Sequence, residues 1–168
     1  MKWTEGHIHV AMRKILAEQG WLLVAGEFPG GSDHELYPLN VVDPILARDG
    51  SPDHRRHSLG ELIPDLVALR GRYLFIGEAK VRYDADDRIK LELLLSKRRE
   101  HFLNALRKFS KERRIPELLP VETLVLCPTL VFKADNSIVP PPSDALSYLR
   151  IVNSNEAFFE GKLNDISA

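Results

Sequence analysis

Cysteine and long hydrophobic runs are scarce in this 168-residue sequence. The single cysteine, Cys127, excludes an intrachain disulfide and fits a reducing compartment. No apolar run approaches the roughly 18 residues that a membrane-spanning helix needs. The first residues also lack the apolar core of a signal peptide. We therefore expect a cytoplasmic protein with no membrane partner.

Net charge is scarce as well. The formal charge is −1, so no global positive field points to nucleic acid, and any basic surface must be local. The sequence has no Gly-rich loop followed by Lys, which argues against an ATP-driven motor. It has no paired Cys or His spacing of the zinc-site kind. Length and an apolar content of 44% predict one domain, residues 1–168, with a proper core.

Residues 63–80 contain two short apolar runs joined by a turn, which is the pattern of a β-hairpin. Gly71 at the first position of a two-residue loop, Gly71-Arg72, suits a type II′ turn. That loop sets the register of the two strands. It predicts three cross-strand pairs: Arg70 with Tyr73, Val67 with Ile76, and Asp65 with Glu78.

Strand alternation places Asp65, Glu78 and Lys80 on one face of this hairpin. Two carboxylates about 5 Å apart repel by roughly 3 kcal/mol at an effective dielectric constant near 20. A divalent cation removes this cost, and carboxylate oxygens suit Mg²⁺. Lys80 neutralises part of the charge, or holds a water molecule or a phosphate oxygen.

Apart from these polar residues, both faces of the hairpin are apolar. One face carries Val67, Leu69, Leu74 and Ile76, and the other carries Leu66, Ala68, Tyr73 and Phe75. Strands that are buried on both faces need helices on both sides of the sheet. The sequence therefore predicts an α/β protein of the α/β/α sandwich type.

Pro64-Asp65, twelve intervening residues, and Glu78-Ala79-Lys80 together resemble the signature of the PD-(D/E)XK nuclease superfamily. The resemblance implies a restriction-endonuclease-like fold with a central mixed sheet. It also implies a metal-dependent endonuclease that hydrolyses phosphodiester bonds, with DNA as the expected partner. Asp65, Glu78 and the Ala79 backbone carbonyl would then bind one or two Mg²⁺ ions, for which Mn²⁺ can substitute. Lys80 would position or activate the attacking water, or stabilise the transition state.

Two alternatives remain open beside this reading. One is a nuclease subunit that cuts only with a DNA-recognising partner, because the chain is barely larger than the catalytic fold. A homodimer would serve the same need. The other is a non-catalytic nucleic-acid-binding or assembly module that kept the fold. RNA in place of DNA also remains open.

The first helix is predicted over residues 5–19, with apolar side chains at helical spacing. Thr4 is its expected N-cap, and Gly20 its expected stop. The resemblance implies an acidic residue on this helix near the metal, but the corresponding position holds His9. The fourth site residue is therefore open among Glu5, His9 and Glu27, the last at the end of a strand predicted over residues 21–28. For each, a solvated surface residue is the competing interpretation.

Two basic segments are candidates for nucleic-acid binding. Residues 29–60 are predicted to form a Pro- and Gly-rich loop that contains Arg55 and Arg56, and the resemblance implies that this loop is an insertion. A long helix predicted over residues 87–110 is basic and includes Lys97, Arg98 and Arg99. Ordinary solvated surface is the competing interpretation for both.

The remaining predictions concern the C-terminal part of the chain. A strand is expected over residues 121–127 inside the sheet, with residues 130–132 either extending it or pairing at an edge. A short helix capped by Ser143 is expected over residues 144–150. Residues 153–168 form a tail in which Phe158 and Phe159 would dock while the polar end frays.

Overall fold

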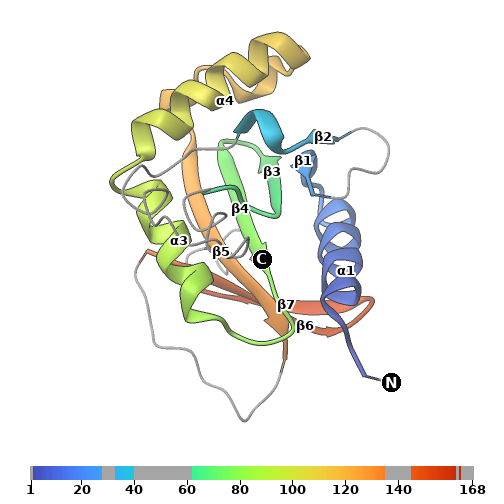
Figure 1. The fold of residues 1–168 in the computed structure, drawn as a ribbon. Coiled ribbons are helices and arrows are strands. Elements are labelled where there is room, and N and C mark those ends of the chain that lie inside the picture. Colours follow the sequence, from blue (N-terminus) through green and yellow to red (C-terminus); the bar gives the residue numbers. More distant parts are fainter. Residues whose placement is uncertain (1, 28–32, 40–61, 135–144, 162, 164–168) are drawn as a thin grey trace.

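The computed structural model describes residues 2–27, 33–39, 62–134, 145–161 and 163 (Figure 1). Most of the segment of residues 29–60, including Arg55 and Arg56, lies outside the described residues. The same holds for Ser143 and for residues 164–168 of the tail. Predictions on those segments therefore stay predictions.

The described strands form one seven-stranded mixed sheet in the order β2-β1-β3-β4-β5-β6-β7. Three pairings are parallel, β1–β2, β4–β5 and β5–β6, and the others are antiparallel. The prediction of an α/β protein with a central mixed sheet is confirmed. The strands are β1 Leu22–Gly26, β2 His34–Glu35, β3 Leu66–Arg70, β4 Tyr73–Ala79, β5 Val125–Lys133, β6 Ser147–Asn153 and β7 Glu156–Glu160.

Helices cover both faces of this sheet (Figure 1). α1, Glu5–Glu18, packs on one face, and α3, Ala85–Leu95, and α4, Arg99–Arg113, pack on the other. The two apolar faces of the central hairpin divide between these cores as expected. Val67, Leu69, Leu74 and Ile76 join the core under α3 and α4, and Leu66, Ala68 and Phe75 join the core under α1. None of the helices in the described part of the chain is long and apolar enough to cross a membrane.

The central hairpin has the predicted loop. Arg70 pairs with Tyr73, and Gly71 has φ = 61°, which L-residues with a Cβ rarely adopt. The ladder ends where Leu66 pairs with Gly77. The predicted ladder pair of Asp65 with Glu78 is therefore wrong. The N–H of Asp65 donates instead to the Gly77 carbonyl at 2.8 Å, so Asp65 leaves the regular register just before the strand begins.

The first helix also agrees with its sequence signals. Thr4 caps it in a reciprocal capping box with His7. Gly20, with φ = 86°, follows its C-terminal end. The capping box fixes the N-terminal turn, which is the turn that carries Glu5.

The single long helix predicted over residues 87–110 is wrong, because α3 and α4 are separate helices. α3 ends before the break at residues 96–98, where the hydroxyl of Ser96 donates to the Glu92 carbonyl at 2.6 Å. Both helices then bury their apolar side chains in one core, namely Leu91 and Leu94 from α3 and Phe102, Leu103, Leu106 and Phe109 from α4.

The C-terminal third differs most from prediction. Residues 121–123 form a 3₁₀ turn, and β5 begins later and runs through residues 130–132. The helix expected over residues 144–150 is wrong, because β6 occupies Ser147–Asn153 and pairs in parallel with β5. Burial of consecutive residues on both faces of β6 favours a strand over the local helical pattern. β7 follows, and Phe159 docks as expected, whereas Phe158 is 44% exposed.

Candidate metal site

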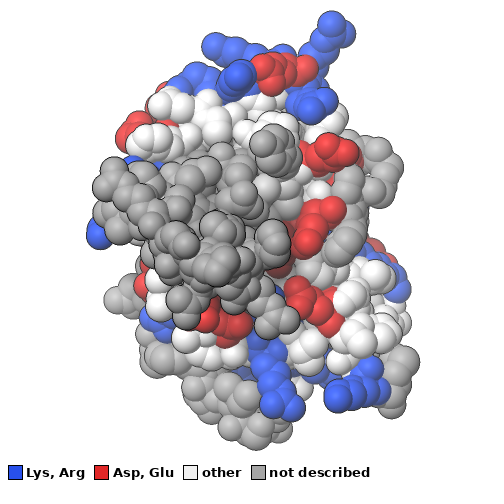
Figure 2. All heavy atoms as spheres, in the orientation of Figure 1, with Lys and Arg blue, Asp and Glu red and all other residues white. Residues whose placement is uncertain are grey.

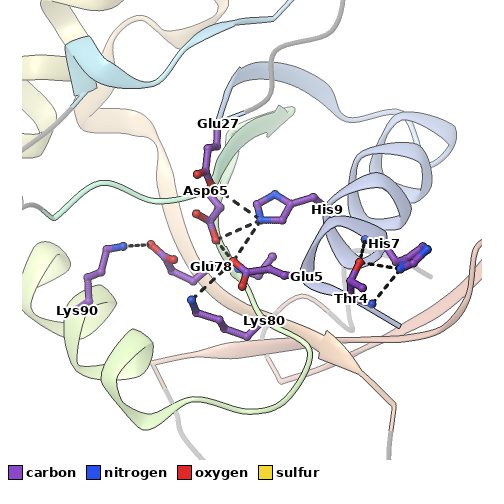
Figure 3. Close-up of polar contacts among 10 residues, drawn as sticks. Thr4, Glu5, His7, His9, Glu27, Asp65, Glu78, Lys80 and Lys90 are labelled. Carbon is purple, nitrogen blue, oxygen red and sulfur yellow. Dashed lines mark hydrogen bonds and ion pairs between the residues drawn. The ribbon is translucent and has the colours of Figure 1, made fainter. Parts of the chain in front are cut away.

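The candidate residues in the described part of the chain come from four neighbouring elements. α1 provides Glu5 and His9, and Glu27 follows β1. Asp65 precedes β3, β4 carries Glu78 and Ala79, and Lys80 follows β4. Their side chains converge at the ends of three neighbouring internal strands, β1, β3 and β4 (Figure 3). The three alternatives for the fourth site residue, Glu5, His9 and Glu27, therefore all lie in the site.

His9 is the centre of the acidic cluster. Its side chain is almost fully buried, and Nε2 lies 3.8 Å from Glu5 Oε1, 3.9 Å from Glu27 Oε2 and 3.9 Å from Asp65 Oδ2. Glu5 and His9 are four residues apart on α1, so they lie one turn apart on the same face of the helix. The imidazole joins the helix to the two strands of the site (Figure 3).

Backbone hydrogen bonds hold Asp65 in place. Its Oδ2 accepts from the Ala79 N–H at 2.8 Å, and its own carbonyl accepts from the Glu27 N–H at 3.0 Å. Its side chain is only 15% exposed. Because three backbone contacts, including that to Gly77, orient this carboxylate, it is positioned before any ligand arrives. The N–H and the carbonyl group of one strand residue point toward the same neighbouring strand. The Ala79 carbonyl is therefore on the side of β4 that carries Asp65.

Glu5, His9 and Asp65 fit a divalent cation. One ligand atom from each of them lies within 4.8 Å of the other two. Carboxylate oxygens suit Mg²⁺ and Mn²⁺, and a neutral imidazole adds a nitrogen that first-row transition metals accept well. The donor set is therefore chemically compatible with the Mg²⁺ or Mn²⁺ that the sequence pattern predicts.

Crowding of carboxylates perturbs the acids around this cluster. Burial, a hydrogen bond to Asp65 and the charges of Asp65 and Glu5 raise the pKa of Glu27 to about 7. Burial and the nearby carboxylates of Asp84 and Asp65 raise the pKa of Asp87 to about 6, although Lys80 and Lys90 oppose the shift. These shifts are those of a site with more negative charge than its own lysines neutralise.

Glu78 lies deeper than the other acids and turns away from His9. Its side chain is 2% exposed, and its Oε1 is 2.6 Å from Nζ of Lys90 on α3. Burial, and then the charge of Asp65, raise the pKa of Glu78 well above its ordinary value, whereas Lys90 lowers it. Glu78 is thus near enough for the charge of Asp65 to shift its pKa, but its side chain extends toward Lys90 (Figure 3).

Lys80 remains an ammonium group in this site. Its Nζ lies 3.7 Å from Glu5 Oε1. Burial disfavours its charge, but the surrounding carboxylates outweigh burial and raise the pKa of Lys80 above its ordinary value. The carboxylates responsible are Asp87, Glu5, Asp65 and Asp84. A lysine in this state can donate hydrogen bonds or balance charge, and it cannot take a proton at neutral pH.

Sequence reasoning missed Lys90 and Asp87 as site residues. Both residues lie in the helix predicted over residues 87–110, but neither was assigned to the site. The two are three residues apart on α3, so they share a helix face, and that face returns over the end of β4. The available signal was the position of this helix directly after the strand that carries Glu78.

A cavity of about 500 Å³ opens beside the cluster. It reaches from the acidic residues to an apolar wall. The residues that line it are Gly26, Glu27, Glu35, Leu36, Ile63, Pro64, Asp65 and Lys90. It offers space for a substrate group next to Asp65.

A salt bridge anchors α1 to this side of the sheet. Arg13 contacts both carboxylate oxygens of Asp33 at 2.8 and 2.9 Å, and the Asp33 side chain is 1% exposed. Gly26 leaves room for this pair, because a Cβ at Gly26 would lie 2.6 Å from Arg13 Nη1. The salt bridge joins the helix that carries His9 to the residue before β2, which pairs with β1, the strand that leads to Glu27.

The basic residues lie apart from the acidic cluster. Figure 2 shows Lys and Arg gathered over α4 at the top of the view, with acidic side chains below them. Lys97 and Arg99 are exposed at the break between α3 and α4, and Arg98 is half-buried there. Arg107 pairs with Glu122, so part of the α4 charge is neutralised locally.

Comparison of the chain with protein-family models, curated proteins and solved structures finds no match in any of the three. The fold and the site define an α/β protein with a mixed sheet and a candidate metal site at the ends of its internal strands.

Proposed function

We propose that this protein is a metal-dependent endonuclease that hydrolyses phosphodiester bonds, with DNA as its expected substrate. One observation carries the proposal: Glu5, His9 and Asp65 form a cluster of metal-ligand spacing beside Lys80, the lysine of the sequence motif. A restriction-endonuclease-like arrangement is part of the same proposal.

The proposed metal ligands are Asp65, Glu5 and His9, with Glu78 and the Ala79 carbonyl on the neighbouring strand. Asp65 is the best-positioned of these, because backbone groups already orient it. Mg²⁺ or Mn²⁺ bound there would lower the pKa of a coordinated water and neutralise charge on the reacting phosphate. The protein itself orients these ligands, and it buries the side chains of His9 and Glu78 away from water.

Lys80 has an electrostatic role in this proposal. The carboxylates near it raise its pKa, so its ammonium group persists at neutral pH. It then donates to a phosphate oxygen or to the attacking water and stabilises the charge that develops in the transition state. Of the roles expected for Lys80, positioning and charge stabilisation fit its environment, and activation of water as a general base does not.

The backbone of the nucleic acid would lie along the basic surface. Lys97, Arg98 and Arg99 are the proposed phosphate contacts, and the exposed residues Lys111, Arg113 and Arg114 extend the surface along α4. Contacts of this kind give affinity without sequence preference. A second copy or a partner protein would then be needed to read sequence or structure in the DNA.

A plasmid-nicking assay tests the proposed activity. Supercoiled plasmid is incubated with the protein in Mg²⁺, Mn²⁺, Ca²⁺ or a chelator, beside Asp65→Ala, Lys80→Ala and the matched control Lys14→Ala on the exposed face of α1. We expect nicking in Mg²⁺ and Mn²⁺ that both site variants lose and the control retains.

Other outcomes distinguish the alternatives. Nicking that persists in the chelator, or in Asp65→Ala, contradicts the proposal. Binding without cleavage in every condition favours the non-catalytic module. Cleavage that appears only after addition of a cell extract favours the partner-dependent subunit. Faster cleavage of an RNA of the same sequence would change the substrate class.

A further inference from the structure

Lys90 forms an ion pair with Glu78, the most deeply buried acid of the site. Its Nζ lies 2.6 Å from Oε1 of Glu78, and the Glu78 side chain is 2% exposed. A carboxylate at that depth is costly to keep ionised unless a positive charge accompanies it. Lys90 provides that charge from α3, on the opposite side of Glu78 from the Glu5–His9–Asp65 cluster (Figure 3).

Lys90 also reaches the cavity beside the cluster. It lines the same 500 Å³ space as Asp65 and Glu27, and its side chain is 26% exposed. The ammonium group can therefore move into this cavity when it leaves Glu78. A lysine on a flexible four-carbon stem can make this exchange, whereas a residue locked in the core cannot.

We infer that Lys90 is an internal counter-cation: its ammonium group neutralises Glu78 in the ion-free protein and competes with a divalent cation for that carboxylate. The inference rests on the proposed metal site. In this role Lys90 is a positioning residue, and it sets how tightly the site binds metal. Metal binding then requires Lys90 to release Glu78 and turn toward the cavity.

The competition has a definite sign. An ammonium group that shares a carboxylate with a divalent cation repels that cation at short range. Removal of the ammonium group removes both the repulsion and the competitor. Divalent-cation affinity should therefore rise when Lys90 is neutralised. If Lys90 instead only supported Glu78 structurally, its loss would leave the affinity unchanged or lower.

Calorimetric titration with Mn²⁺ alone, without nucleic acid, tests the inference. The proteins are the wild type, Lys90→Gln, Lys90→Arg, the exposed control Lys108→Gln on α4 and the site variant Asp65→Asn. We expect Mn²⁺ to bind Lys90→Gln about tenfold more tightly than the wild type. Lys108→Gln should stay within about twofold of the wild type, because Lys108 is exposed on α4, which carries none of the site residues. Asp65→Asn should lose binding.

Lys90→Arg keeps the test decisive if Lys90→Gln does not fold. Arginine retains the charge and grips a carboxylate with two parallel hydrogen bonds. We therefore expect weaker Mn²⁺ binding in Lys90→Arg than in the wild type. Equal or tighter binding in Lys90→Arg overturns the inference, as does unchanged or weaker binding in a folded Lys90→Gln.

Thermal unfolding gives a second readout that does not depend on heat of binding. In chelator, Lys90→Gln should unfold at a lower temperature than the wild type, because Glu78 loses its counter-charge. Mn²⁺ should raise its Tm by more than it raises that of the wild type, because a ligand stabilises in proportion to its affinity. A Tm gain no larger than that of the wild type contradicts the inference.

The same experiment separates this inference from the proposed function. Binding that needs Asp65 but is not tightened in Lys90→Gln supports the metal site and overturns only the role of Lys90. Binding in Lys90→Gln that the wild type lacks supports the counter-cation directly. Absence of saturable binding in the wild type and in both Lys90 variants overturns the metal site and the role of Lys90 together.

Discussion

Nε2 of His9 lies 3.9 Å from Oδ2 of Asp65, although one residue is on the first helix and the other directly precedes β3. The contact brings the sequence motif and α1 into one site. Carboxylate oxygens of Glu5 and Glu27 also lie within 4 Å of this nitrogen. Three carboxylates of the site therefore surround the imidazole of His9.

His9→Ala should weaken metal binding and plasmid nicking by about 10- to 100-fold, since it removes either a ligand or the group that orients three carboxylates. His9→Asp restores the acid that the superfamily resemblance implies at this position, and it should recover part of the activity. Nicking rates at several Mg²⁺ concentrations measure both effects. His101→Ala on the exposed face of α4 is the control. Wild-type nicking and metal dependence in His9→Ala would exclude His9 from the site.

Metal-free protein should lose stability as the pH rises from about 5 to about 8. The pKa of Glu27 is raised from 4.5 to about 7, and that of Asp87 from 3.8 to about 6, so the folded state binds more protons than the unfolded state in this window. Stability from a raised acid pKa is present at low pH and is lost as the acid ionises. Thermal unfolding in chelator across this pH range measures the loss.

Glu27→Gln is the matched variant for the pH experiment. It cannot ionise, so its Tm should fall less steeply between pH 5 and pH 8 than that of the wild type. Addition of Mg²⁺ should reduce the slope of the wild type, because a cation favours the ionised carboxylates. A wild-type Tm that is flat or rises over the window, relative to Glu27→Gln, contradicts the prediction.

Arg13→Met should lower the free energy of unfolding by about 3 kcal/mol, because it leaves the buried Asp33 carboxylate without its guanidinium partner. Urea unfolding measures the change. Lys14→Met, on the next residue, removes a lysine that is 4.0 Å from Glu18 on the surface, and it should cost less than about 0.5 kcal/mol. Equal effects of the two substitutions would show that the Arg13–Asp33 pair contributes no more than a surface pair.

Neutralising Lys97 and Arg99 together should weaken binding to duplex DNA and lower the slope of log K against log salt by about 2. Both side chains are exposed at the break between α3 and α4. Arg107→Gln is the comparison, because Arg107 already pairs with Glu122, and it should change the slope less. Binding is measured by fluorescence anisotropy in Ca²⁺ at several salt concentrations. An unchanged slope in the double variant would show that Lys97 and Arg99 do not contact the phosphates of the DNA.

Local sequence was sufficient for the elements whose signals are short-range. Thr4 and Gly20 delimit α1, and Gly71 sets the turn of the hairpin, because capping and turn geometry depend on a few adjacent residues. Alternation along the hairpin also assigned its apolar residues to two cores correctly, since strand parity is a property of the backbone.

Tertiary contacts decided the rest. β6 pairs with β5 where a helix was predicted, because burial on both faces outweighs local helical spacing. α3 and α4 are separate helices where one long helix was predicted, and both bury apolar side chains in the same core. In the site, the motif placed Asp65, Glu78 and Lys80 close in sequence. Only the packing of α1 and α3 on opposite faces of the sheet brings His9 and Lys90 to them, because contacts between distant segments leave no periodic trace in the sequence.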